Sequence, residues 1–190
     1  MPTPARVIVL PADDGPLKVV DVELPDPAPH QVIVKQFASG VCHSQLHQMH
    51  TPRQSPVVLG HESTGIVLQK GSAVTHVKEG DTVMVTWVPR DANAATRDPD
   101  RAELKLADGS TAVSQNVFTW ADTTIADEQF VVKVDANIEK EVTSIIGCAV
   151  MTGAGAVENT AAVKEGDSVA IFGVGGVGLS AVVAAKKLGA

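Results

Sequence analysis

The chain has 190 residues, of which 44% are hydrophobic and 19% charged, and its net charge is -7. This length and composition suit one domain, or one domain and part of a second, around a packed core, and they exclude a disordered chain. The charges form no long run of either sign, which argues against nucleic acid or a membrane as a partner and leaves a small organic ligand.

The first part of the chain alternates short β-rich segments with turns of Pro, Gly and Asp. Strands are predicted at Arg6–Leu10, Leu17–Glu23, Gln31–Phe37, Ser63–Gln69, Thr82–Val88 and Phe130–Val134. Their spacing predicts a compact, largely antiparallel β domain. The polar stretch from Pro89 to Thr119 lacks periodicity, and we expect it to form a long loop.

After Asp135 the pattern changes to that of helices around one buried strand. The predicted elements are a helix at Glu139–Ile146, a helix at Gly153–Ala162, a strand at Ser168–Phe172 and a helix at Val177–Leu188. The last two form the first strand-turn-helix step of a doubly wound domain. Because a parallel strand needs neighbours, we expect further chain, or another chain, to complete its sheet.

The only two cysteines, Cys42 and Cys148, lie far apart, and the first ten residues do not read as a secretory leader. Isolated thiols in such a chain more often stay reduced than form a disulfide. We therefore expect a cytoplasmic protein.

The segment from Cys42 to His47 places a thiol, a hydroxyl and two imidazoles within six residues. These groups can ligate zinc, but a buried structural cysteine beside surface histidines would show the same pattern. A second segment has His61 and Glu62 between Gly60 and Gly65, whose tight turns would hold His61 in a fixed place.

Cys148 lies in an apolar helical segment and, taken alone, is most simply a small buried side chain. Together with Cys42 and His61, however, it makes the three-ligand set of a catalytic zinc that keeps its fourth position open.

The last motif is a hydrophobic strand that runs into the sequence GVGGVG and then into a helix. Gly173, Gly175 and Gly178 meet the G-x-G-x-x-G spacing, which lets the backbone approach a pyrophosphate at a helix N-terminus. A glycine-rich packing turn without a ligand is the alternative. The apolar run Ser168–Ala185 has the length of a membrane span, but its glycines fit a strand, turn and helix better.

In this order the four motifs resemble the zinc-containing medium-chain dehydrogenase/reductase family, to which zinc alcohol dehydrogenases belong. The family signature G-H-E-x-x-G-x5-G is met from Gly60 to Gly71, and the resemblance covers nearly the whole chain. It implies an α/β fold overall. Residues 1–150 would form a GroES-like, β-rich catalytic zinc domain, and residues 151–190 the incomplete first part of a Rossmann domain.

The resemblance also implies the site residues. The metal would be bound by Cys42, His61 and Cys148, with Glu62 as a carboxylate that can approach it. The implied catalytic residues are Ser44 and His47, which form a proton relay, and Trp87 would line the substrate pocket. The cofactor would be bound by His43, Thr152, Gly173, Gly175, Gly176, Val177 and Gly178.

The implied reaction is reversible hydride transfer between NAD and a primary or secondary alcohol, aromatic alcohols included. Zinc would act as a Lewis acid on the alcohol oxygen, while Ser44 and His47 carry its proton to solvent. NADP stays open, because the residue that reads the ribose would lie beyond Ala190. The implied partners are a small alcohol or aldehyde and, in the full-length form, further copies of the same chain.

Two departures from the family pattern change these expectations. Many members carry four cysteines for a structural zinc where this chain has the cysteine-free stretch Pro89–Thr119, so we expect one catalytic zinc only. Gln45 stands where the family usually has an Asp that accepts a hydrogen bond from the zinc-bound imidazole. A neutral amide can still accept that bond, but without charge assistance, so we expect weaker zinc binding.

Two other functions remain compatible with these residues. The chain can be a truncated product that folds its GroES-like part and binds zinc without catalysis. It can also resemble the zinc-free quinone or enone reductases of the same superfamily, although a zinc-free protein has no need of Cys42, His61 and Cys148 together.

Overall fold

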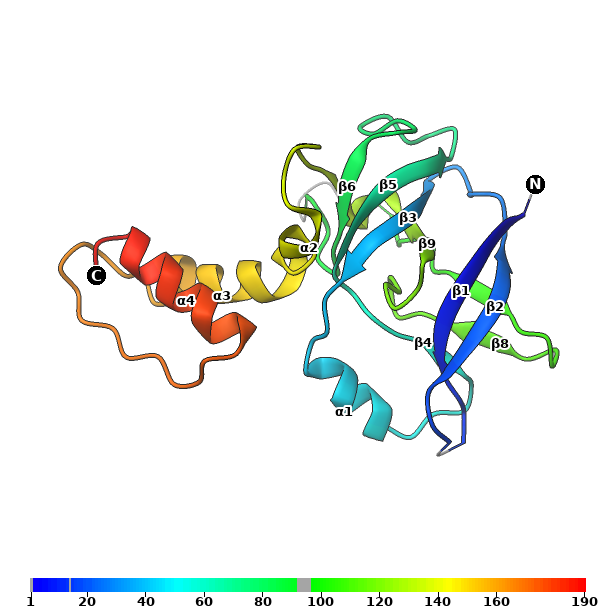
Figure 1. The fold of residues 1–190 in the computed structure, drawn as a ribbon, viewed down its shortest axis with the longest axis horizontal. Coiled ribbons are helices and arrows are strands. Elements are labelled where there is room, and N and C mark those ends of the chain that lie inside the picture. The colour runs from blue at the N-terminus through cyan, green and yellow to red at the C-terminus, as the bar shows by residue number, and fades with distance from the viewer. Residues whose placement is uncertain (1, 14, 92–96) are drawn as a thin grey trace.

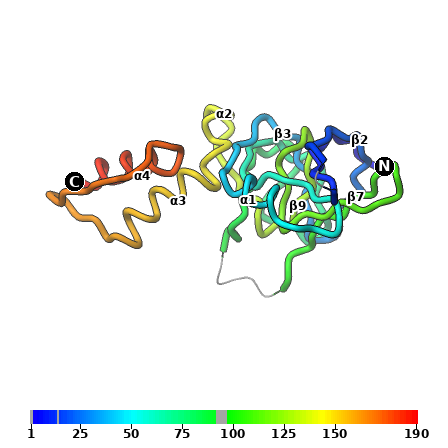
Figure 2. The backbone as a smooth tube through the Cα atoms, turned by 90° about the horizontal axis from the view of Figure 1, so that it is seen from below, coloured from blue at the N-terminus to red at the C-terminus, as the bar shows by residue number. Residues whose placement is uncertain are grey.

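A computed structural model describes residues 2–13, 15–91 and 97–190. It shows a β-rich body from which an arm of helices extends, with the C-terminus at the far end of the arm (Figure 1). A view turned by 90° shows the same separation of body and arm (Figure 2). Within the described ranges, no helix has the length and apolarity that crossing a membrane requires.

The body is built from two five-stranded sheets with the orders β2-β1-β4-β8-β7 and β10-β6-β5-β3-β9. Neighbouring strands run antiparallel except for β4 and β8. The strands are β1 (Thr3–Leu10), β2 (Lys18–Leu24), β3 (Gln31–Ser39), β4 (Val57–Val58), β5 (Ser63–Lys70), β6 (Thr82–Val85), β7 (Glu103–Lys105), β8 (Thr111–Val113), β9 (Thr123–Asp127) and β10 (Val131–Lys133).

The buried apolar side chains form two clusters, and the first of them also takes Ile33 of β3 and Ile125 of β9 from the second sheet. Val7, Leu24 and Phe118 belong to the cluster against the first sheet, and all three are fully buried. Val34 and Val85 belong to the cluster against the second sheet. Apolar and polar residues alternate along β1 and β2, which places one face of each strand in the core. This alternation is the reason that the amino-acid sequence predicts strands here.

The six predicted strands are confirmed as β1, β2, β3, β5, β6 and β10, with ends that differ by a few residues. The antiparallel character of the body is also confirmed. The prediction of one long loop from Pro89 to Thr119 is wrong for its second half, which contains the hairpin β7–β8. Leu104 and Ala112 of that hairpin are buried, but strands of three residues are too short to show a period. Residues 92–96 of this stretch lie outside the described residues.

The helical elements are α1 (Ser44–His50), the 3-10 turn η1 (Glu128–Phe130), α2 (Lys140–Thr143), the π-helical turn η2 (Ile146–Val150), α3 (Met151–Gly155), the π-helical turn η3 (Ala156–Thr160) and α4 (Gly176–Lys187). The two helices predicted between Glu139 and Ala162 are thus one nearly continuous run in which α and π turns alternate. The predicted last helix is confirmed as α4, which packs against the run through Val157, Ala181 and Ala185.

The predicted strand Ser168–Phe172 is wrong: these residues form no strand, and the Phe172 side chain is 97% exposed. A strand exists only through hydrogen bonds to a neighbour, and no described residue supplies one here. The segment instead belongs to a long loop between η3 and α4 (Figure 1), and Ile171 packs against the apolar cluster of Val157, Ala181 and Ala185.

Candidate metal centre and its pocket

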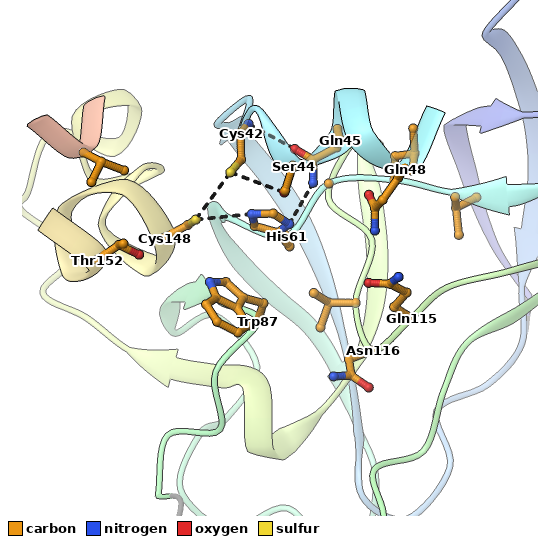
Figure 3. Close-up of a pocket in the computed structure, with 15 residues that line it drawn as sticks. Cys42, Ser44, Gln45, Gln48, His61, Trp87, Gln115, Asn116, Cys148 and Thr152 are labelled. Carbon is orange, nitrogen blue, oxygen red and sulfur yellow. Dashed lines mark hydrogen bonds between the residues drawn. The ribbon is translucent and has the colours of Figure 1, made fainter. Parts of the chain in front are cut away.

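Three separate segments bring Cys42, His61 and Cys148 together (Figure 3). Cys42 follows the end of β3, His61 stands in the turn before β5, and Cys148 lies in the π-helical turn η2. The first two segments are joined by a hydrogen bond from the Gly40 N–H to the Glu62 carbonyl at 3.0 Å. The third is joined to the body where the Thr86 hydroxyl donates to the Gly147 carbonyl at 2.6 Å.

One ligand atom from each of these three residues lies within 4.8 Å of the other two, so the group could hold a metal ion. The two sulfurs are 3.8 Å apart, and Nε2 of His61 is 3.3 Å from Sγ of Cys148. Tetrahedral zinc, with bonds of about 2.3 Å to sulfur and about 2.0 Å to nitrogen, separates two sulfurs by about 3.8 Å and sulfur from nitrogen by about 3.5 Å. The donor types and the spacing of this group therefore fit zinc.

Burial changes the protonation behaviour of the site in the absence of a cation. Desolvation, followed by the nearby charges of Glu62 and Cys42, raises the pKa of the Cys148 thiol to about 12. Burial also lowers the pKa of His61 and raises that of Glu62, the latter against a backbone hydrogen bond. All three shifts favour neutral side chains, so a bound cation is what would stabilise a thiolate here.

Glu62 lies behind the three ligands rather than among them. Its side chain is buried, and Oε2 accepts a hydrogen bond from the Ala149 N–H at 3.2 Å. A Cβ atom on Gly40 would meet the Glu62 carboxylate at 2.6 Å, so glycine is needed there to leave room for it. The carboxylate thus connects the His61 turn to the π-helical turn that carries Cys148.

Gln45 contacts two of the three ligand residues. Its Oε1 accepts from the Cys42 N–H at 3.0 Å, and its Nε2 lies 2.7 Å from Nδ1 of His61. The expectation that this amide accepts a hydrogen bond from the imidazole is therefore corrected, because its only oxygen already bonds to Cys42 and its nitrogen faces His61.

The three ligands line a cavity of about 490 Å³. Val58, Leu59 and Trp87 form apolar parts of its wall. The Trp87 ring lies edge-on to that of His61, with the two ring centroids 6.4 Å apart. Gln48, Gln115 and Asn116 add amide groups that no sequence motif marks (Figure 3). The last two follow β8, in the stretch predicted to be a loop.

The residues predicted to form a proton relay are near one another but not connected. The Ser44 hydroxyl lines the cavity and donates to Sγ of Cys42 at 3.4 Å. His47 is exposed and packs against the ring of His43, with centroids 5.3 Å apart. Among the described residues, no hydrogen bond joins Ser44 to His47.

The glycine-rich turn reaches the same cavity from the arm. Thr152 and Val177 line the cavity beside Cys148. Gly173 has a φ of +98°, and a Cβ atom on Gly178 would stand 1.9 Å from the Gly173 carbonyl oxygen, so the turn closes only with glycine. Open space lies in front of Gly173 and Gly175. Within the described part of the chain, no side chain caps the N-terminus of α4, which begins at Gly176. Free N–H groups there suit an anion.

Comparison with known proteins supplies the family. Residues 28–136 match the model of the alcohol dehydrogenase GroES-like domain. The chain belongs to the zinc-containing alcohol dehydrogenase family. A solved structure of an alcohol dehydrogenase zinc-binding domain protein from Burkholderia ambifaria is 30% identical, with a TM-score of 0.89, and the match covers 100% of this chain and 57% of that one.

Other members of the family share the fold and part of the sequence. Benzyl alcohol dehydrogenase from Acinetobacter calcoaceticus is 27% identical with a TM-score of 0.84, over 99% of this chain and 57% of that chain. S-(hydroxymethyl)glutathione dehydrogenase from Escherichia coli is 32% identical over 96% of this chain and 56% of its own length. The chain thus spans about half the length of the curated relatives that it matches.

Proposed function

We propose that this chain carries the zinc site and the substrate pocket of an alcohol dehydrogenase that transfers hydride reversibly between an alcohol and NAD. The observation that carries the proposal is the cavity itself, in which Cys42, His61 and Cys148 meet Thr152 and Val177 of the arm. Candidate ligands for a metal and the edge of a turn that would bind a dinucleotide therefore line one cavity. When bound, zinc would supply Lewis acidity toward an alcohol or carbonyl oxygen, and the nicotinamide would exchange hydride.

Residues of this chain would bind the metal, transfer the proton and support the ligands. Cys42, His61 and Cys148 would hold one zinc, and the Ser44 hydroxyl, inside the cavity, would take the proton of the alcohol. His47, exposed next to His43, would pass that proton on to solvent, and transfer to it from Ser44 would need a bridging group such as a water, because no hydrogen bond joins the two among the described residues. Glu62 would support the ligands through its contact with Ala149.

The turn from Gly173 to Gly178 and the uncapped start of α4 would receive the pyrophosphate of NAD. Thr152 would lie beside the nicotinamide and His43 near the phosphates. The first Rossmann step, residues 151–190, would follow a catalytic domain of residues 1–150. Like other members of the family, the full-length protein would form homo-oligomers.

The wall of the cavity favours an aromatic primary alcohol as substrate. Trp87 offers a flat ring beside the ligands (Figure 3), and Val58 and Leu59 add apolar surface to the cavity wall. The likeness to a benzyl alcohol dehydrogenase supports the same choice.

Zinc content and turnover, measured on the same samples, test this function. We expect about one zinc per chain in the wild type, loss of zinc in Cys148→Ser and His61→Gln, and NAD reduction with benzyl alcohol only in zinc-loaded protein. His76→Gln is the matched control, because His76 bonds to the Val131 carbonyl outside the cavity and its loss should leave zinc bound.

Two results separate the alternatives. Zinc binding without turnover would show a zinc-binding chain that catalyses nothing by itself. Folded, freshly purified protein without zinc would contradict the proposal and favour a metal-free reductase.

A further inference from the structure

Gln45 is buried on α1, with 2% of its surface exposed, and its amide group lies between two metal-ligand residues. The orientation of this amide is determined by the backbone. The Cys42 N–H, 3.0 Å away, can only donate, so the amide atom facing it must be the oxygen. The atom that faces His61 at 2.7 Å is therefore the NH₂ group.

This polarity determines which nitrogen of His61 carries the proton. Because the Gln45 NH₂ group donates, Nδ1 of His61 must accept with its lone pair. A proton on Nδ1 would place two donors 2.7 Å apart. The proton of the ring is then on Nε2, which faces Sγ of Cys148 at 3.3 Å, where the metal would bind.

Zinc binding at Nε2 needs the other tautomer. A ligating imidazole has its lone pair on the metal and its proton on the second nitrogen, which a neighbouring acceptor stabilises. Gln45 supplies that acceptor only if its amide rotates, and rotation turns the NH₂ group toward the Cys42 N–H. A carboxylate would accept from both groups at once, whereas this amide satisfies one of them at a time.

We propose that Gln45 is a positioning residue that holds His61 in the Nε2–H tautomer and thereby makes zinc compete with a hydrogen-bond arrangement that excludes it. The proposal rests on the zinc site of the proposed function and adds its regulation. The chain loads zinc only at higher free zinc concentrations than a carboxylate-supported site would, and loading rotates the Gln45 amide.

Gln45→Glu tests this directly, since Glu is isosteric and replaces the donating NH₂ group with an accepting oxygen. We expect zinc, titrated against a competing chelator dye, to bind about 10- to 100-fold more tightly than in the wild type, the usual size of such an effect. Gln48→Glu is the matched control. Gln48 lines the same cavity one turn along α1, and its Oε1 has no hydrogen-bond partner, so the variant adds the same charge without changing the contact to His61.

The tautomer is measured in metal-free protein by long-range ¹H–¹⁵N correlation of the imidazoles. The chain has six histidines, and the signals that disappear in His61→Gln identify His61. We expect the proton on Nε2 in the wild type and in Gln48→Glu, and on Nδ1 in Gln45→Glu.

Two outcomes would overturn the proposal: a proton on Nδ1 in metal-free wild type, or equal tightening of zinc binding by Gln45→Glu and Gln48→Glu. The wild-type spectrum decides the first point even if Gln45→Glu does not fold. If the wild type binds no zinc at all, the proposed function fails, whereas the spectrum still reports on Gln45 independently.

Discussion

Single glycines determine where the ligand side chains lie. Gly60 immediately precedes His61 and has a φ of +91°, a conformation that other residues rarely adopt. A Cβ atom at Gly60 would meet the Thr119 hydroxyl at 2.5 Å and the Trp120 backbone nitrogen at 2.6 Å. The turn therefore packs directly against the segment of Thr119 and Trp120, and this contact fixes the direction of the His61 side chain.

Gly60→Ala should lower the free energy of unfolding by about 2 kcal/mol or more, because a strained φ adds to a collision with backbone. It should also weaken zinc binding. Gly80→Ala is the control, since Gly80 has a φ of +85° but nothing within 4 Å of its Cβ position, so it should cost only about 1 kcal/mol and leave zinc binding intact. Urea denaturation and zinc titration measure both effects, and equal losses in the two variants would contradict this account.

At the scale of elements, the π-helical turn η2 connects the arm to the metal site. The Gly147 carbonyl accepts from the buried Thr86 hydroxyl, which belongs to the residue following β6. A Cβ atom on Gly147 would stand 2.9 Å from Cβ of Thr86, so these two segments of the chain are in direct contact. A π turn adds a residue to the helical register, and such turns are frequent at functional sites. This one presents Cys148 to the cavity and the Ala149 N–H to Glu62.

Thr86→Val should keep the shape of the side chain but remove the hydroxyl, which costs about 1–2 kcal/mol and loosens η2. We expect zinc affinity to fall several-fold as Cys148 loses its fixed position. Thr143→Val removes a hydroxyl-to-carbonyl bond of the same length, from Thr143 to Glu139 at the N-cap of α2, and this bond does not involve η2. If both variants weaken zinc binding to the same extent, the bond to η2 has no special role in placing Cys148.

For the whole molecule, the body and the arm differ in how many of their backbone N–H and C=O groups have hydrogen-bond partners. The strands of the body pair on two sheets over two apolar clusters. The arm has one small cluster, and the connection of residues 161–175 between η3 and α4 contains no helix or strand. Exposed backbone without hydrogen-bonded partners is where local opening and proteolysis concentrate.

Limited chymotrypsin treatment should therefore cut first after Phe172, whose side chain is 97% exposed, while Phe118 and Phe130 stay protected in the body. Mass spectrometry of the first product identifies the site, and Phe172→Ser should delay the cut. Zinc should stay with the larger product, because Cys42, His61 and Cys148 all precede the cut. A first cut within the β strands would contradict this division of the molecule.

The sequence by itself determined the features that depend on residue identity and local spacing. Alternation of apolar residues predicted the paired strands of the body, and the glycines from Gly173 to Gly178 predicted a tight turn before α4. The residue types at Cys42, His61 and Cys148 predicted a zinc-ligand set, and the structure brings their ligand atoms within 4.8 Å.

Only the tertiary structure decided what depends on distant partners. The hairpin β7–β8 exists because β4 pairs with it across more than fifty residues of sequence, and this places Gln115 and Asn116 in the cavity. Residues 168–172 form no strand because a strand is defined by its neighbour rather than by its own residues. The direction of the Gln45 amide follows from the position of the Cys42 N–H, since a side chain with one donor and one acceptor end takes its orientation from the groups that the fold places around it.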